Sequence, residues 1–291
     1  MTFDEISTNE WQALDSAHHM APFTDYGDLR QKGARIITHA EGHYIYDSDG
    51  NRILDGMAGL WCVNVGYGRP ELVEAAATQM TKLPYYNNFF RTSNQPVAEL
   101  SAKLAEITPD GLSNVFYANS GSEANDTIIR MVRHYWALEG KPEKRVIISR
   151  DFGYHGSTIM SASMGGMSGM HEQAANEPDF AHIRPPYGFL HQGNQDEAEF
   201  AANAASWLDD KINEIGASNV AAFVAEPIQG AGGVIVPPAG YFKHIQEICR
   251  RHDILFVADE VITGFGRTGQ WFASQTVSYT HLRAHETYRD L

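Results

Sequence analysis

The chain of 291 residues is long enough to bury a large core, and it exceeds the usual size of one compact domain. Hydrophobic residues make up 43% of it and charged residues 20%, a balance that excludes a disordered protein. Its formal net charge is −14, and no Lys/Arg-rich stretch offsets this, so nucleic acid is not expected as a partner.

Cysteine and histidine give no sign of a disulfide framework or a metal site. The two cysteines, Cys62 and Cys249, lie far apart, as is typical of reduced thiols in a cytoplasmic protein. The 13 histidines are scattered without the spacing of metal ligands. Residues 1–10 lack the apolar core of a secretory signal, and no apolar run reaches membrane-spanning length. We therefore expect a cytoplasmic protein with neither metal nor membrane partner.

The first predicted elements are a hairpin and two helices. Residues 42–47 alternate and are rich in aromatic side chains, residues 48–51 signal a turn, and residues 52–55 continue as the second strand. Helical periodicity then covers residues 70–80 and 96–107.

From residue 113 onward, short apolar strands alternate with helices and glycine-bearing loops. Strands are predicted at 115–118, 145–149, 220–225 and 254–258, and helices at 123–138 and 241–251. This alternation predicts an α/β fold with a mostly parallel sheet covered by helices on both faces. Ligands of such sheets bind beyond the carboxyl ends of the strands, where the polar groups of this sequence also fall.

The stretch 153–170 is rich in glycine, serine and methionine. Gly165, Gly166 and Gly169 predict a loop that passes close to other backbone. No internal repeat or low-complexity tract is evident in the chain.

Ser120-Gly121-Ser122-Glu123 joins the first of these strands to a helix. Free N–H groups and the positive end of the helix dipole form an anion seat there, and Gly121 permits close approach of the backbone. The same residues also fit a capping box, with Ser120 as the cap and Glu123 three positions on. The two interpretations are compatible, and the residues alone do not choose between them.

Aromatic and acidic residues follow the later strands. Tyr154 and His155 come after the second strand, where a ring can stack on a flat heterocycle, although an ordinary surface turn explains them too. Asp259 ends the strand 254–258, and a carboxylate there needs a partner. A protonated ring nitrogen would serve through a charge-assisted hydrogen bond worth about 1.5–3 kcal/mol. A helix cap or an ion pair with Arg267 is the alternative.

Two further features are ambiguous. Glu226, at the end of another strand, is either a site residue or an anchor for the loop before Pro227. Residues 264–269 fit the dinucleotide pattern G-x-G-x-x-G, which would indicate a nicotinamide oxidoreductase. That pattern should open a helix directly after a strand, whereas residues 259–263 intervene here and no helix start follows, so we interpret it as a loop.

Six blocks, taken together, resemble the class III pyridoxal-phosphate aminotransferases. The likeness is greatest to omega-transaminases that pass an amino group from putrescine, other amines or beta-amino acids to pyruvate. It runs from Trp11 to Ala273, in HHMAPFTD at 18–25, DGMAGLWCVNVGYG at 55–68, SGSEAND at 120–126, YHGST at 154–158, EPIQGAGG at 226–233 and DEVITGFGRTG at 259–269. The resemblance implies a PLP-transferase fold of type I, pyridoxal 5′-phosphate as cofactor, and a homodimer acting on an amine donor and a 2-oxo acid.

The resemblance also implies roles for individual residues. The backbone of Ser120, Gly121 and Ser122 corresponds to the phosphate cradle, and Tyr154 to the residue that stacks on the pyridine ring, with His155 beside it. The remaining positions correspond to the partner of the ring nitrogen (Asp259), the packing group on the other ring face (Val261), a supporting carboxylate (Glu226) and walls of the substrate pocket (Trp61 and Phe89).

One departure from the family pattern affects catalysis. The Schiff-base lysine of the family lies beyond the aspartate, whereas the last lysine here is Lys243, upstream of Asp259. We therefore assign no catalytic residue and expect this chain to be inactive as given. Residues 1–65 are interpreted as an N-terminal segment with the hairpin, 66–275 as a PLP-binding large domain incomplete at its C-terminus, and 276–291 as a foreign tail. An aminomutase, another fold-type I enzyme, or a non-catalytic cofactor-binding fragment is the alternative.

Overall fold

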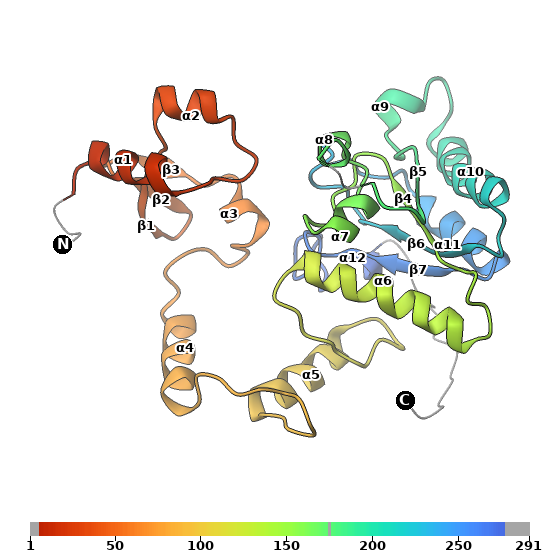
Figure 1. Cartoon of the computed structure of the whole chain (residues 1–291), viewed down its shortest axis with the longest axis horizontal. Coiled ribbons are helices and arrows are strands. Elements are labelled where there is room, and N and C mark those ends of the chain that lie inside the picture. Colours follow the sequence, from red (N-terminus) through yellow and green to blue (C-terminus); the bar gives the residue numbers. More distant parts are fainter. Residues whose placement is uncertain (1–5, 174–175, 277–291) are drawn as a thin grey trace. The chain divides into compact units, whose positions relative to one another are not determined.

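Figure 1 shows the computed structural model of the chain, which describes residues 6–173 and 176–276. The chain divides into two compact units, Met1–Thr92 and Ser93–Leu291. The domain boundaries expected after residues 65 and 275 stay predictions. The expected tail lies outside the described residues from residue 277 onward.

The first unit contains a small antiparallel sheet and several helices. Its elements are α1 Thr8–His18, α2 Tyr26–Lys32, β1 Ile37–Glu41, β2 Tyr44–Asp47, β3 Arg52–Leu54, α3 Ala58–Trp61 and α4 Pro70–Lys82. Strands β2 and β3 pair with Tyr44 opposite Leu54, so the predicted hairpin is confirmed. The sequence did not predict β1, which adds to the other edge of β2. Its residues are mostly exposed, and apolar alternation is therefore weak.

The two helices predicted from periodicity are confirmed. Helix α4 begins with Pro70 at its first position, where a missing N–H costs nothing. Helix α5, Gln95–Ile107, opens the second unit and is capped by Asn94, whose side chain accepts from the N–H of Val97 at 3.1 Å. Neither helix buries a residue within the described chain, although both carry an apolar stripe.

The second unit is built on a four-stranded parallel sheet with the order β5-β4-β6-β7. The strands are β4 Val146–Arg150, β5 Phe180–Ile183, β6 Val220–Ala225 and β7 Leu255–Ala258. Helices α6 Gly121–Leu138 and α7 Ile159–Met164 pack on one face, and α10 Glu197–Ile215 and α11 Tyr241–Arg251 on the other. Figure 1 shows these helices around the sheet. Shorter helices are α8 Ser168–His171, α9 Gly188–His191 and α12 Ala273–Thr276.

The side chains of the strands alternate between the two faces. Ile148 and Phe223 enter the core beneath α10 and α11, whereas Ile147 and Ala222 enter the core beneath α6. Because both faces are covered, the strands are almost continuously apolar, as β6 shows with every residue buried. The predicted α/β class and the parallel sheet are confirmed.

One predicted strand is wrong. Residues 115–118 form no strand, and Phe116 is 66% exposed. Valine and aromatic residues favour extended backbone, but a strand also needs a neighbour to hydrogen-bond with, and none of the described strands pairs with this segment. The longest elements that the sequence analysis missed in the second unit are strand β5 and helix α10. The stretch 153–170, predicted as a loop, contains the short helices α7 and α8.

The glycines of that stretch behave as predicted at two of three positions. A Cβ on Gly166 would lie 2.3 Å from the carbonyl oxygen of Arg150, and one on Gly165 would lie 3.1 Å from that of Gly153. Gly169 faces open space, so close backbone approach does not explain it.

We predict that Trp136→Phe destabilises the second unit by about 1–3 kcal/mol. The Trp136 ring is 2% exposed, and its Nε1 donates to the carbonyl oxygen of Ala221 in β6 at 2.8 Å. Phenylalanine leaves a gap and removes the donor. Urea unfolding followed by circular dichroism measures the loss. The matched control is Trp271→Phe, which changes a side chain 52% exposed and should shift stability by less than about 0.5 kcal/mol. Equal losses from both substitutions would contradict the prediction.

Candidate active site

Three neighbouring strands end side by side. Strands β4, β6 and β7 are parallel, with Ile148 opposite Phe223 and Ala225 opposite Ala258. Their carboxyl ends therefore lie along the same edge of the sheet, and the residues that follow them can meet there.

A buried cluster joins residues from two of these strand ends and from α6. His155 Nδ1 lies 2.8 Å from Asp259 Oδ2, and the two side chains are 2% and 6% exposed. Asn125 Nδ2, on α6, donates to the same Asp259 oxygen at 3.0 Å and to the carbonyl oxygen of His155 at 2.7 Å. The backbone N–H of Val261 donates to Asp259 Oδ1 at 3.2 Å. The sequence left the partner of Asp259 open, and in the structure its side chain contacts those of His155 and Asn125.

The surroundings of Asp259 favour its charged form. Burial raises the pKa of this carboxyl, but the hydrogen bond and the charge of His155, helped by Asn125 and Val261, outweigh burial and hold the pKa below its ordinary value. The site therefore contains a fixed negative charge at neutral pH, in a position almost closed to water.

Glu226 ties two of the loops at this edge together. Its Oε1 accepts from the N–H of Tyr154 at 3.2 Å, and its Oε2 accepts from the N–H of Gly230 at 2.8 Å. The guanidinium of Arg150, at the end of β4, donates to the backbone carbonyl oxygen of Glu226. Glu226 is 5% exposed and burial raises its pKa, although the charges of His155 and Arg150 and the two backbone bonds oppose this.

The raised pKa of Glu226 predicts a specific pH dependence of stability. The folded state holds this proton more tightly than the unfolded state does, so the contribution is complete below the ordinary value of 4.5 and is lost as pH rises through the raised pKa. Wild type should therefore lose stability relative to Glu226→Gln as pH rises from the ordinary value of 4.5 through the raised pKa. Urea unfolding of both proteins at these pH values measures the difference. A difference that is constant with pH would contradict the prediction.

The N-terminus of α6 lies at the same edge. Ser120 caps the helix by accepting from the N–H of Glu123 at 3.1 Å, while Glu123 accepts from the N–H of Asn119 at 2.9 Å. The N–H groups of Gly121 and Ser122 have no acceptor within the part of the chain that the structure describes. The helix start is therefore capped by Ser120, but the reciprocal bond of a capping box is absent, because Glu123 bonds the N–H of Asn119 and not that of Ser120. The two unpaired N–H groups leave the anion seat possible as a prediction.

Close contacts connect this helix start to the other loops. Ser122 Oγ accepts from the N–H of Ser157 at 3.0 Å. A Cβ on Gly156 would lie 2.7 Å from Ser122 Cα, and one on Gly121 would lie 3.1 Å from a methyl group of Val261. The free N–H groups and the Asp259 cluster are thus parts of one continuous wall.

The structure thereby brings together most of the residues singled out by sequence. These are Ser120, Gly121, Ser122, Tyr154, His155, Glu226, Asp259 and Val261. Tyr154 is half-buried, whereas Val261 is 71% exposed. Trp61 and Phe89 belong to the first unit, where Trp61 ends α3 and Phe89 is 69% exposed.

Two site residues escaped the sequence analysis. Asn125 looks like an ordinary polar residue of a helix, and only its place one turn after Gly121 indicates that it lies on the same face at the same end. Arg150 ends an apolar strand, where an arginine ordinarily points into water. In the structure Arg150 is 2% exposed, and its guanidinium donates a hydrogen bond to the backbone carbonyl oxygen of Glu226.

The G-x-G-x-x-G segment is a loop and opens no helix. The N–H of Phe265 donates to the carbonyl oxygen of Trp271 at 2.6 Å, and that of Gly266 to Gln270 at 3.0 Å, which folds residues 264–271 back on themselves. This excludes the dinucleotide interpretation. In residues 6–173 and 176–276, no three acidic, histidine or cysteine side chains gather as metal ligands would. The described helices include none with the length and apolar character needed to cross a membrane.

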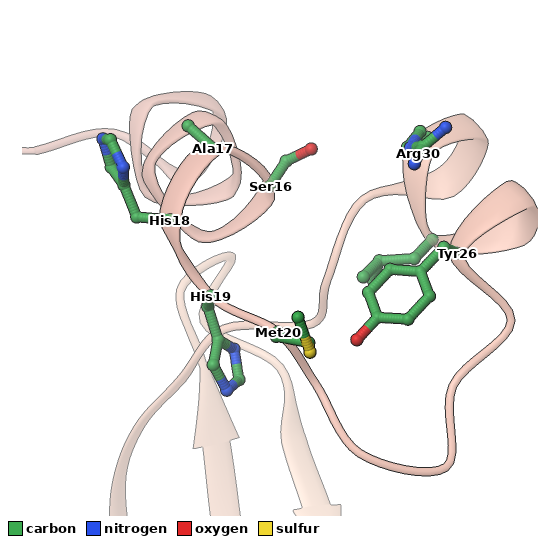
Figure 2. Close-up of a pocket in the computed structure, with 8 residues that line it drawn as sticks. Ser16, Ala17, His18, His19, Met20, Tyr26 and Arg30 are labelled. Atoms are coloured by element: carbon green, nitrogen blue, oxygen red, sulfur yellow. The ribbon is translucent and has the colours of Figure 1, made fainter. Parts of the chain in front are cut away.

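An open hollow of about 420 Å³ occurs in the first unit, and none of the predicted site residues lines it. Figure 2 shows Tyr26 facing Met20 across it, while His18 points to the other side of α1. His19, which also lines the hollow, pairs with Asp15 at 2.8 Å. Nothing in this lining resembles the charged cluster at the strand ends.

The fold and the strand-end cluster define an α/β protein with a candidate ligand site at the carboxyl edge of its parallel sheet. Residues 28–281 match the family described as aminotransferase class-III. The chain belongs to the class III aminotransferases, whose cofactor is pyridoxal 5′-phosphate, so the resemblance and the cofactor expected from the sequence are confirmed.

Individual relatives agree with this family. The chain is 60% identical over 269 residues to a putrescine–pyruvate aminotransferase of Pseudomonas aeruginosa. The aligned region covers 92% of this chain and 59% of the relative. It is 43% identical over 270 residues to a vanillin aminotransferase of Capsicum annuum, covering 92% and 58%. The chain thus spans less than two thirds of the length of these relatives.

Solved structures give the same result. An (S)-enantioselective omega-transaminase from Thermomicrobium roseum superimposes with a TM-score of 0.91 at 41% identity, covering 94% of this chain and 61% of that one. An omega transaminase from Pseudomonas jessenii, solved in complex with PMP, gives 0.89 at 43% identity, covering 92% and 59%. The expected PLP-transferase fold is therefore confirmed.

Proposed function

We propose that these residues form the cofactor-binding part of a transaminase that moves an amino group from an amine, or from a beta- or omega-amino acid, to pyruvate or a similar 2-oxo acid. The observation that carries the proposal is the buried Asp259–His155 pair beside the free N–H groups of α6. The similarity to a putrescine–pyruvate aminotransferase supports putrescine or a related amine as the donor.

The chemistry of the residues present fits pyridoxal phosphate. The N–H groups of Gly121 and Ser122 are donors without acceptors at the positive end of an 18-residue helix, which suits a phosphate dianion. Asp259 Oδ1 accepts one long backbone hydrogen bond of 3.2 Å, so it retains a lone pair for a ring N–H. Tyr154 and Val261 would pack on the two ring faces, as the family resemblance implies.

When bound, the cofactor supplies an electron sink for the carbanion formed at the substrate carbon. Asp259 would keep a proton on the ring nitrogen of the bound cofactor, because its negative charge is stabilised by His155 and Asn125. Glu226 holds the loops of Tyr154 and Gly230 at a set spacing. These residues therefore bind, orient and charge the site without themselves moving a substrate proton.

The lysine that would move that proton is not provided by these residues. The last lysine, Lys243, lies in α11, upstream of Asp259. The buried Lys144 donates to the carbonyl oxygens of Val220 and Asp253. These oxygens lie next to the amino ends of β6 and β7, at the opposite ends of the strands from Asp259. We infer that the 291-residue chain binds its cofactor without a covalent bond and does not transaminate.

Trp61 and Phe89 are proposed as walls of the amine pocket. A structurally similar omega transaminase, engineered for asymmetric synthesis of enantiopure bulky amines, carries exchanges at a tryptophan and at a phenylalanine 28 residues later. Trp61 and Phe89 have the same spacing. This match supports the assignment of both residues to substrate selection.

A cytoplasmic homodimer is proposed for the enzyme. Helix α4 has an apolar stripe but buries no residue, and Leu72, Val73 and Met80 are each more than half exposed. Such a stripe on an otherwise polar helix supports a protein partner, and a second copy of the chain is the simplest one.

Titration of the purified chain with pyridoxal phosphate tests the proposed function. We expect a saturable change in the absorbance of the cofactor, which borohydride does not convert into a stable adduct because no lysine is linked. Addition of putrescine and pyruvate should produce no amino transfer. Absence of any spectral change would contradict cofactor binding, whereas a borohydride-stable adduct or turnover would contradict the inference about the lysine. Binding without turnover under all conditions would also fit a non-catalytic cofactor-binding fragment, the alternative considered above.

A further inference from the structure

Four consecutive residues of the first unit adopt left-handed backbone. In α3, φ is +48° at Ala58, +59° at Gly59, +64° at Leu60 and +71° at Trp61. Only glycine takes this region without strain, because in other residues Cβ crowds the following carbonyl oxygen. A strained run of this kind persists only where its surroundings hold it, and such strain collects at functional sites.

Asp55 and Tyr67 hold this turn, and we call the pair the Asp55–Tyr67 brace. Asp55 Oδ1 accepts from the N–H of Met57 at 3.1 Å, and Oδ2 accepts from the N–H of Gly59 at 2.7 Å. The hydroxyl of Tyr67 donates to the same Oδ2 at 2.7 Å. A single carboxylate therefore binds two amides of the turn and a side chain from beyond it.

The brace also connects the turn to the sheet. The N–H of Tyr67 donates to the carbonyl oxygen of Gly42, between β1 and β2, at 2.8 Å. The N–H of Asp55 donates to the carbonyl oxygen of His43 at 3.0 Å. The tyrosine hydroxyl lies 3.1 Å from where a Cβ on Gly59 would be, so it packs directly on the turn. These two hydrogen bonds therefore fix the orientation of the turn relative to the hairpin.

We propose that Asp55 and Tyr67 are positioning residues that hold the left-handed turn and thereby fix the orientation of Trp61. The consequence for selectivity rests on the proposed function, which assigns Trp61 to the amine pocket. Two residues that touch no substrate would then decide which amines fit, because release of the turn lets Trp61 take other orientations.

Amide hydrogen exchange of the 291-residue chain tests the brace. The N–H groups of Trp61 and Cys62 donate to Met57 and Ala58 within the turn, each at 2.9 Å. We expect Tyr67→Phe to speed their exchange about tenfold, since one charged hydrogen bond is lost, and Asp55→Ala on the order of a hundredfold, since three are lost. The matched control is Tyr46→Phe. The hydroxyl of Tyr46 has no hydrogen-bond partner among residues 6–173 and 176–276, so its removal should leave these exchange rates unchanged.

Fluorescence gives a second, independent measure. The emission of Trp61, isolated by subtracting the spectrum of Trp61→Phe in each background, should shift to longer wavelength in Tyr67→Phe and not in Tyr46→Phe. Unchanged exchange in the turn, or an equal increase at Ile45 and Ile53 in the hairpin, would overturn the proposal, because Tyr67 would then have no role or only a general one. Neither measurement needs cofactor or amine, so failure of the cofactor titration would leave this result standing.

Discussion

Replacement of Asp259 with asparagine is expected to weaken binding of pyridoxal phosphate to this chain by about ten- to a hundredfold. A hydrogen bond between a carboxylate and a protonated ring nitrogen is worth about 1.5–3 kcal/mol, and about 1.4 kcal/mol corresponds to a factor of ten. Asparagine has almost the same shape and can still accept from Asn125, but it carries no charge to keep the ring protonated. The dissociation constant, measured by absorbance titration, reports the loss.

The substitution separates charge from folding. Burial raises the pKa of Asp259, but the hydrogen bonds to His155 and Asn125 lower it further than burial raises it. The folded protein therefore retains the carboxylate anion at neutral pH. The matched control is Asp210→Asn, which removes a negative charge from an exposed position on α10. That variant should bind the cofactor as wild type does. Unchanged affinity in Asp259→Asn, or an equal loss in both variants, would show that Asp259 is not the ring partner.

The position of Asp259 could be predicted because the topology of a parallel sheet determines where the strand ends lie. Parallel strands joined by helices place their carboxyl ends together, so the residues that end β4, β6 and β7 were expected at one edge. Continuous apolar runs located β6 and β7, because nearly every residue there faces a covering helix. The residue types at the strand ends thus predicted which side chains would gather at this edge, without knowledge of any individual contact.

The errors have a common physical cause. Residues 115–118 have the local preference for a strand but no neighbour among the described strands, and pairing depends on residues distant in the sequence. Strand β5 is short and mixes Phe180 with alanine and histidine, so its pattern is weak, yet β4 beside it supplies the hydrogen bonds. Local composition reports preference, whereas the partner decides the outcome.

Asn125 and Arg150 show the same limit for side chains. Both are polar residues whose burial becomes evident only when the loops after β4 and β6 close over them. The left-handed turn at Ala58–Trp61 is a stronger case, since three of its residues oppose that backbone and the responsible bonds come from Asp55 and Tyr67. Contacts set by tertiary structure override local preference at the places where function is proposed.

Replacement of Gly156 with alanine should be among the most disruptive single changes in the second unit. Its φ is +134°, and an added Cβ would lie 2.7 Å from Ser122 Cα, a backbone atom that cannot move aside independently. Backbone strain and overpacking together are expected to destabilise the fold by about 2–4 kcal/mol. Relief of the clash would push Ser122 outward, so the free N–H groups at the start of α6 would lose their positions and cofactor affinity would fall as well.

Gly233→Ala isolates the contribution of backbone strain. Its φ is +111°, similar to that of Gly156, but no atom lies within 4 Å of the added Cβ, so the expected loss is only about 1–2 kcal/mol with little effect on cofactor binding. Urea unfolding and cofactor titration of both variants distinguish strain from contact with the helix start. If Gly156→Ala lost no more stability than Gly233→Ala and bound the cofactor equally well, the loop after β4 would not be packed against α6, and the continuous wall proposed for the site would be wrong.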